Sequence, residues 1–151
     1  METPRPPTAK RIAAARERLG ITQDMMADRL GLSSMSYYDL EVDDDEAFMS
    51  LSLAQLRTLA RILGVSARTL VSDTNAPSAE TSVSMHELVA RVQALVSAEH
   101  ITADVFGERV GWDVSNALSN PESAWQEWCI DTLRDVSEAV GISWRAVLPD
   151  S

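Results

Sequence analysis

The most constraining feature of this chain is a pattern of residues that occurs twice. One set of matched positions lies 80 residues apart and pairs Arg11 with Arg91, Ile21 with Ile101, Thr22 with Thr102, Asp24 with Asp104, Arg29 with Arg109, and Gly31 with Gly111. A second set lies 77 residues apart and pairs Leu56 with Leu133, Arg57 with Arg134, Gly64 with Gly141, Ser66 with Ser143, and Arg68 with Arg145. The smaller separation indicates a three-residue deletion between the two sets, which loops tolerate. The sequence therefore predicts one supersecondary unit present in two copies.

Both copies have the signals of short helices joined by tight turns. Apolar residues recur three or four positions apart, as in Leu53, Leu56 and Leu59, which places them on one helix face. The expected helix starts are Thr22, Ser33, Ser52, Ser66, Ser84, Thr102, Asp113, Ser123 and Ser143, and the expected stops are Gly20, Gly31, Gly64, Gly111 and Gly141. No segment reads as a strand. We therefore expect an all-α fold of two tandem helical bundles, each with about five short helices.

Composition divides the chain into four parts. Three prolines keep the first residues out of a helix, so we expect a disordered tail over residues 1–8. Residues 74–83 lack an apolar period and have linker composition. These stretches leave one bundle at residues 9–73 and another at residues 84–151. Each bundle is near the smallest size that supports its own core, and the sequence leaves open whether the two pack together.

Composition also argues against several classes of protein. No apolar run approaches the roughly 18 residues of a membrane span, and the first residues lack the apolar stretch of a secretory signal, so we expect a cytoplasmic location and no membrane contact. Cys129 is the only cysteine, so we expect no metal and no cofactor and place its side chain in the core. The chain has no glycine-rich phosphate loop and no nucleophile motif, so we expect no enzymatic activity.

Residues 22–41, TQDMMADRLGLSSMSYYDLE, resemble the helix-turn-helix of the lambda repressor and Cro family, also called the Xre family. The matching positions are Gln23, Ala27, Gly31 and Ser33, and the resemblance extends over about residues 9–73. It implies a lambda-repressor-like bundle in which Ala27 lets two helices cross closely and Gly31 forms the turn. The second half resembles a degenerate copy of the same domain, because its third predicted helix stops early.

The resemblance implies a surface for DNA. In relatives that bind operators, the start of the third helix enters the major groove while neighbouring side chains hold phosphates. The positions that this implies are Gln23, Ser34, Met35, Ser36 and Tyr38, with Lys10, Arg11 and Arg16 of the first helix near the backbone. On this hypothesis the chain is a DNA-binding transcriptional regulator that acts on a double-stranded operator, and a homodimer is one expected assembly.

The charge of the chain favours a different partner. The net charge is -10, and acidic residues occupy positions where a DNA-binding relative is expected to have cations. Trp128 lies off the predicted core face of its helix and either packs between the lobes or anchors a partner. The alternative hypothesis is an acidic antitoxin, immunity protein or adaptor that binds a basic toxin or nuclease and no DNA. Its expected contact residues are Asp39, Asp43, Asp44, Asp45, Glu46, Phe48, Met49 and Trp128.

Overall fold

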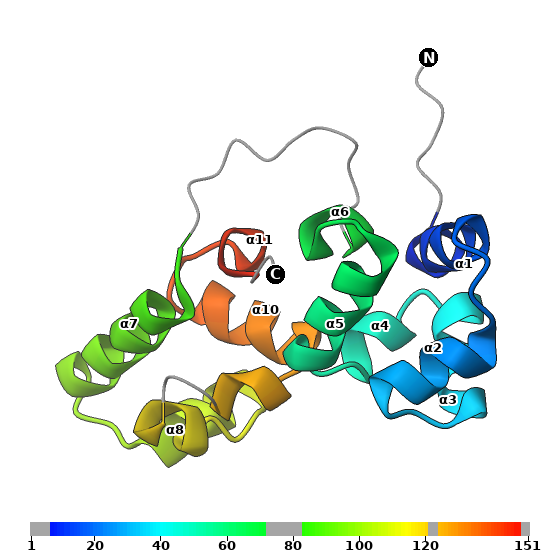
Figure 1. The fold of residues 1–151 in the computed structure, drawn as a ribbon. Coiled ribbons are helices and arrows are strands. Elements are labelled where there is room, and N and C mark those ends of the chain that lie inside the picture. Colours follow the sequence, from blue (N-terminus) through cyan, green and yellow to red (C-terminus); the bar gives the residue numbers. More distant parts are fainter. Residues whose placement is uncertain (1–6, 72–82, 121–123, 149–151) are drawn as a thin grey trace.

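The computed structural model describes residues 7–71, 83–120 and 124–148, and all regular structure in these ranges is helical (Figure 1). The first half contains α1 (Thr8–Arg18), α2 (Gln23–Leu30), α3 (Ser34–Val42), α4 (Glu46–Met49), α5 (Leu53–Leu63) and α6 (Ala67–Val71). The second half contains α7 (Met85–Ala98), α8 (Ala103–Val110), α9 (Ser115–Ser119), the 3-10 helix η1 (Ala124–Glu127), α10 (Ile130–Ala139) and α11 (Trp144–Val147). The predicted all-α class is confirmed for the described residues.

Most of the predicted helix starts are confirmed by side-chain hydrogen bonds. The hydroxyl groups of Thr22, Ser33, Ser52, Ser66, Ser84 and Thr102 each accept a hydrogen bond from the backbone amide three residues later. The carboxylate of Asp113 instead accepts from the amide of Ser115, two residues later. The helix start predicted at Ser143 is also confirmed, because Ser143 is the N-cap residue of α11, although its side chain makes no capping hydrogen bond. Ser123 lies outside the described residues.

Two boundaries at the start of the first half and after α3 differ from the prediction. Thr8, which we assigned to the tail, is a buried residue of α1. We expected about five helices in the first half, but the described part of that half contains six, because α4 begins at Glu46. Ala47 in α4 is 1% exposed, and Phe48 packs edge to face against Trp144 with ring centroids 6.3 Å apart. Four residues are too few to show a helical period, so tertiary contacts stabilise α4.

The two halves pack together around one hydrophobic core. α4 contacts α10, and α5 contacts η1. Figure 1 shows α4, α5 and α10 between α1–α3 at one end and α7–α8 at the other. The backbone amide of Leu53 donates to the carbonyl oxygen of Trp128 at 2.7 Å. The guanidinium group of Arg68 donates to the carbonyl oxygen of Ala146 at 2.9 Å. The question of packing that the sequence left open is therefore answered for the described residues.

The second half has features that the predicted repeat requires. Gly111 after α8 and Gly141 after α10 have positive φ, as do Gly31 after α2 and Gly64 after α5. α9 has five residues whereas α3 has nine, in line with the early stop expected there. That the second half is a degenerate copy of the first nevertheless stays a prediction.

Trp128 and Cys129 both lie at the junction of the halves. Each is 9% exposed, and the Sγ atom of Cys129 lies 3.4 Å from Oγ1 of Thr132. The expected core position of Cys129 is confirmed. For Trp128 the packing alternative holds, and its predicted use as an exposed anchor is corrected, because a side chain already packed between helices offers little surface to a partner.

No helix in the described ranges is long and apolar enough to cross a membrane. The same ranges contain no group of three or more His, Cys, Asp or Glu side chains placed to hold a metal ion. The expectations about cellular location, cofactors and catalysis stay predictions.

Candidate binding surface on α3

α3 has apolar side chains on two faces. Ser33 caps its start, and Tyr37 and Leu40 point into the core, where they are 0% and 1% exposed. On the outward side Met35 is 69% exposed, Tyr38 48% and Val42 58%. These three positions are spaced three and four residues apart, so they lie along one stripe of the helix. Folding therefore explains the inward face and leaves the outward stripe without a structural role among the described residues.

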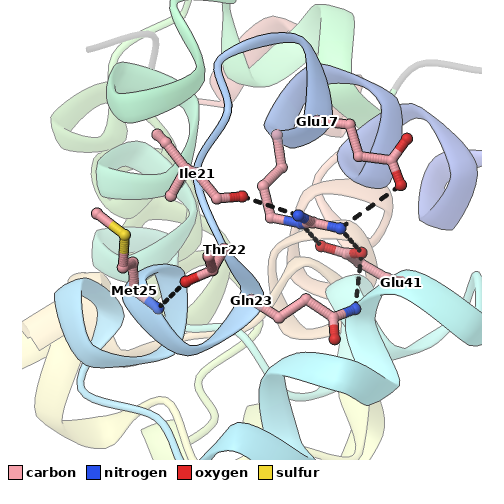
Figure 2. A network of polar contacts seen from close by, with 7 residues as sticks. Glu17, Ile21, Thr22, Gln23, Met25 and Glu41 are labelled. Carbon is pink, nitrogen blue, oxygen red and sulfur yellow. Dashed lines mark hydrogen bonds and ion pairs between the residues drawn. The ribbon is translucent and has the colours of Figure 1, made fainter.

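A buried ion pair fixes α3 against α1. The guanidinium group of Arg16 donates from Nε to Oε2 of Glu41 at 2.6 Å and from Nη2 to Oε1 at 3.0 Å. A third donor, Nη1, reaches the backbone oxygen of Ile21 at 2.8 Å, and Figure 2 shows Glu41 between this network and Gln23. The side chains of Arg16 and Glu41 are only 12% and 4% exposed. The pair therefore holds the last turn of α3 in place rather than facing a ligand.

Gln23 and Tyr37 complete this network. The side-chain amide of Gln23 donates to Oε1 of Glu41 at 3.0 Å. Burial opposes ionisation of Glu41, but the hydrogen bonds that it accepts outweigh burial and hold its pKa below the ordinary value. The Tyr37 hydroxyl is buried close to this carboxylate without a hydrogen bond of good geometry, and desolvation, followed by the nearby Glu41, raises its pKa. Hydrogen bonding to Glu41 raises the pKa of Arg16, so the pair stays charged.

Three of the side chains predicted to contact DNA make hydrogen bonds within the fold. Arg16 and Gln23 point to Glu41, as described above. Arg11 donates from Nε and Nη2 to the backbone oxygen of Leu70 at 3.0 and 2.8 Å, which ties α1 to the end of α6. Each side chain makes hydrogen bonds within the fold, so contact with a phosphate would compete with those bonds. Among the basic residues predicted for DNA contact, only Lys10 is exposed and outside these networks.

The α3 residues predicted to contact DNA lie together at the start of that helix. Ser34, Met35, Ser36 and Tyr38 are all exposed. The Ser34 hydroxyl donates to Oδ1 of Asp24 at 2.7 Å, and the Ser36 hydroxyl lies 2.9 Å from that of Ser33. The expected juxtaposition is therefore present, but Asp24 adds a carboxylate beside it that the sequence analysis did not single out.

The acidic residues after α3 make local hydrogen bonds. Asp43 accepts from the backbone amide of Asp45 at 3.0 Å, and Glu46 accepts from the hydroxyl of Ser50 at 2.6 Å. Asp44 accepts from the backbone amide of Ala9 at 3.0 Å and so caps α1 from a distance of 35 residues in sequence. Within the described ranges Asp39, Asp43, Asp44, Asp45 and Glu46 form no ion pair. No lysine or arginine occurs between Arg29 and Arg57.

These observations define what we call the α3 surface. It consists of Met35, Tyr38, Asp39, Val42, Asp43 and Asp45. Phe48 and Met49, both predicted to contact a protein partner, differ in exposure. Phe48 is half-buried against Trp144, which corrects its predicted role as a partner contact. Met49 in α4 is 61% exposed. The sequence analysis did not single out Val42, although its spacing from Tyr38 was the available signal. Asp44 is excluded because its carboxylate serves α1.

The comparisons with known proteins give one match, and it lies in the first half of the chain. Neither a curated protein nor a solved structure matches the chain. Residues 12–70 match the model of the helix-turn-helix family, and a domain of this family suggests a DNA-binding regulator.

Proposed function

We propose that this chain is a non-enzymatic helix-turn-helix regulatory protein that binds a basic partner protein through the α3 surface. The observation that carries the proposal is the outward stripe of Met35, Tyr38 and Val42, which are 69%, 48% and 58% exposed on a helix whose other face is already buried. The stripe is bordered by carboxylates that lack ion pairs among the described residues. An antitoxin, immunity protein or adaptor would use such a surface.

Energetic reasoning supports a protein rather than a phosphate backbone. Removing an apolar side chain of this size from water contributes about 1.5–3 kcal/mol when burial is complete, and a protein surface can supply that burial. Interfaces combine an apolar centre with a polar rim, as the α3 surface does. The acids attract a cationic partner and raise the rate of encounter, whereas they repel DNA phosphates. Toxins and nucleases that act on nucleic acids present basic surfaces of this kind.

DNA binding is the second candidate, and the family match at residues 12–70 favours it. The exposed hydroxyl groups of Ser34, Ser36 and Tyr38 lie together at the start of α3, where they can bond to base edges. Contact with phosphates then depends on exposed cations such as Lys10, since Arg11 and Arg16 are engaged elsewhere. In this candidate the chain is a transcriptional regulator that acts on an operator through its first half, with the second half as a degenerate copy.

One set of variants separates the two candidates. The chain is titrated with duplex DNA from its own upstream region and with the purified product of a neighbouring gene, each over a series of salt concentrations. On the proposed function, Val42→Ser and Met35→Ser weaken binding of the protein partner. Val105→Ser, which changes a 38% exposed valine of α8, is the matched control and leaves that binding unchanged.

The DNA arm uses a charge reversal. Asp39→Arg combined with Asp45→Lys removes two carboxylates of the α3 surface and leaves the Asp44 cap of α1 intact. Tight duplex binding by the unmodified chain at about 50 mM salt, with a steep negative dependence on salt, would establish the second candidate and overturn the first. Absence of duplex binding, together with loss of partner binding in Val42→Ser, supports the first.

A further inference from the structure

The methionines of the described residues occupy two environments. Met25 in α2, Met35 in α3 and Met49 in α4 are exposed, whereas Met26 and Met85 are buried in the core. A thioether reacts with oxidants in water only where the solvent reaches it. In the folded chain, a dissolved oxidant therefore has access to the three exposed methionines and is kept from the two buried ones.

The single cysteine does not compete with these thioethers for an oxidant. Cys129 is buried where the halves meet, and its Sγ atom lies 3.4 Å from Oγ1 of Thr132. A thiol buried in this way is inert, and a chain with one cysteine has no second thiol for an internal disulfide. Oxidation of sulfur in the folded chain therefore begins at methionine.

Met35 is the most exposed of the three and the one that belongs to the α3 surface. It is 69% exposed at the second residue of α3 and forms the outward stripe together with Tyr38 and Val42. The turn of helix that carries it is held by the Ser33 hydroxyl, which accepts from the backbone amide of Ser36 at 3.1 Å. Because the Met35 side chain has no part in the core, a change in its chemistry leaves the fold intact.

A peroxide carries out the change. The sulfur atom of the thioether attacks one oxygen of hydrogen peroxide, an S–O bond forms, and the O–O bond breaks. The departing hydroxide takes the proton of the transferred oxygen and leaves as water, so sulfur loses the two electrons that the peroxide gains. The product, methionine sulfoxide, is polar, and methionine sulfoxide reductases return it to the thioether.

We propose that Met35 is a redox modification site, and that its oxidation to the sulfoxide releases a protein partner from the α3 surface. This inference rests on the proposed function. A sulfoxide oxygen in the apolar centre of an interface loses its hydrogen bonds to water, and the side chain no longer gains from burial. Reduction restores the apolar side chain, so the release is reversible.

The first arm of the test uses the full chain without a partner. The chain is treated with hydrogen peroxide, and peptide mass spectrometry follows sulfoxide formation at each methionine over time. We expect Met35 to be oxidised about tenfold faster than Met26 and Met85, since susceptibility follows exposure, while the far-ultraviolet circular dichroism stays unchanged. Unfolding the chain in urea should remove the difference. Equal rates in the folded chain overturn the proposal.

The second arm measures binding of the purified product of a neighbouring gene before and after peroxide. We expect oxidation to weaken binding about tenfold, and treatment with methionine sulfoxide reductase to restore it. Met35→Leu cannot form a sulfoxide, so peroxide should not change its affinity from the value before treatment. Met35→Gln places a polar group there and should bind weakly before any treatment.

Met25→Leu is the matched control for this arm. Met25 is also exposed but lies in α2, outside the α3 surface. Its replacement removes one oxidisable side chain and leaves Met35 unchanged. Binding by this variant should therefore be as sensitive to peroxide as binding by the unmodified chain, and loss of that sensitivity would overturn the assignment to Met35.

The outcomes separate the redox switch from the proposed function. If the untreated chain does not bind the gene product, the proposed function is wrong and the switch is wrong with it. If the untreated chain binds and full oxidation of Met35 leaves the affinity unchanged, only the switch is overturned. The switch is also overturned if peroxide weakens binding by Met35→Leu as strongly as binding by the unmodified chain, because another group is then responsible.

Discussion

The guanidinium group of Arg16 holds the carboxylate of Glu41 through two hydrogen bonds, although the two residues are 25 positions apart. The pair connects α1 to the last turn of α3, and both side chains are nearly removed from solvent. It therefore determines how α3 is set on the bundle and which of its residues face outward. The outward stripe of the α3 surface faces solvent because the opposite side of α3 is held against α1.

Removing one member of this ion pair is expected to lower the free energy of unfolding. Glu41→Gln leaves the buried charge of Arg16 without a counter-ion, and we expect a loss of about 3–5 kcal/mol in the free energy of unfolding. The matched control is Glu99→Gln, because Glu99 pairs with Arg109 on the surface, where both side chains are about half exposed. That variant should lose less than about 1 kcal/mol. Urea unfolding measures both, and equal losses would contradict a structural role for the buried pair.

The same pair predicts a dependence of stability on pH. The pKa of Glu41 is lower in the folded chain than its ordinary value of 4.5. Its contribution is therefore fully present above pH 4.5 and is lost as the pH falls through the lower folded value. The difference in unfolding free energy between the unmodified chain and Glu41→Gln should be constant near neutral pH and shrink below pH 4.5. A difference that stays constant down to pH 3 would contradict a stabilising role for the ionised Glu41 carboxylate.

Asp44 is expected to stabilise the fold rather than to bind a ligand. Its carboxylate accepts from the amide of Ala9 at the start of α1, where Pro7 supplies no side-chain cap. Asp44→Ala should lower the unfolding free energy by about 0.5–2 kcal/mol, the usual cost of losing a helix cap. Asp45→Ala removes a neighbouring exposed acid and should change it by less than about 0.5 kcal/mol. Identical thermal unfolding of the two variants would rule out this cap.

Gly107→Ala tests the close contact of α8 with the chain after it. In most helix interiors this exchange stabilises a protein by about 0.5–1 kcal/mol. Here the new Cβ atom would meet the Trp112 carbonyl oxygen at 2.7 Å, and a backbone atom cannot easily move away. We expect a loss of about 1–3 kcal/mol by denaturant titration. A gain in stability would show that α8 and Trp112 are not in contact in solution.

The shared core predicts that the two halves unfold together. All four tryptophans lie in the second half, so tryptophan fluorescence reports on that half, whereas far-ultraviolet circular dichroism reports on helices of both. Because α4 and α5 pack on α10 and η1, the two signals should give the same denaturation midpoint. Two separated midpoints would show that the halves are independent domains.

The sequence alone was sufficient for features that depend on residues close together in the chain. Helix starts at Thr22, Ser33 and Ser52 and the stop at Gly31 follow from bonds spanning three or four residues, and all of them are present. Local geometry is enough for these predictions.

Only the tertiary structure decided which charged and aromatic side chains bind or pack against partners inside the protein. Arg16, Gln23 and Arg11 carry the same chemistry whether they face DNA or a partner inside the protein, and the partners, Glu41 and Leu70, are 18 to 59 residues away. α4, the Asp44 cap and the burial of Trp128 arise in the same way, from segments that meet only after folding. A pattern of neighbours along the chain contains no information about such distances, because they depend on how the helices pack.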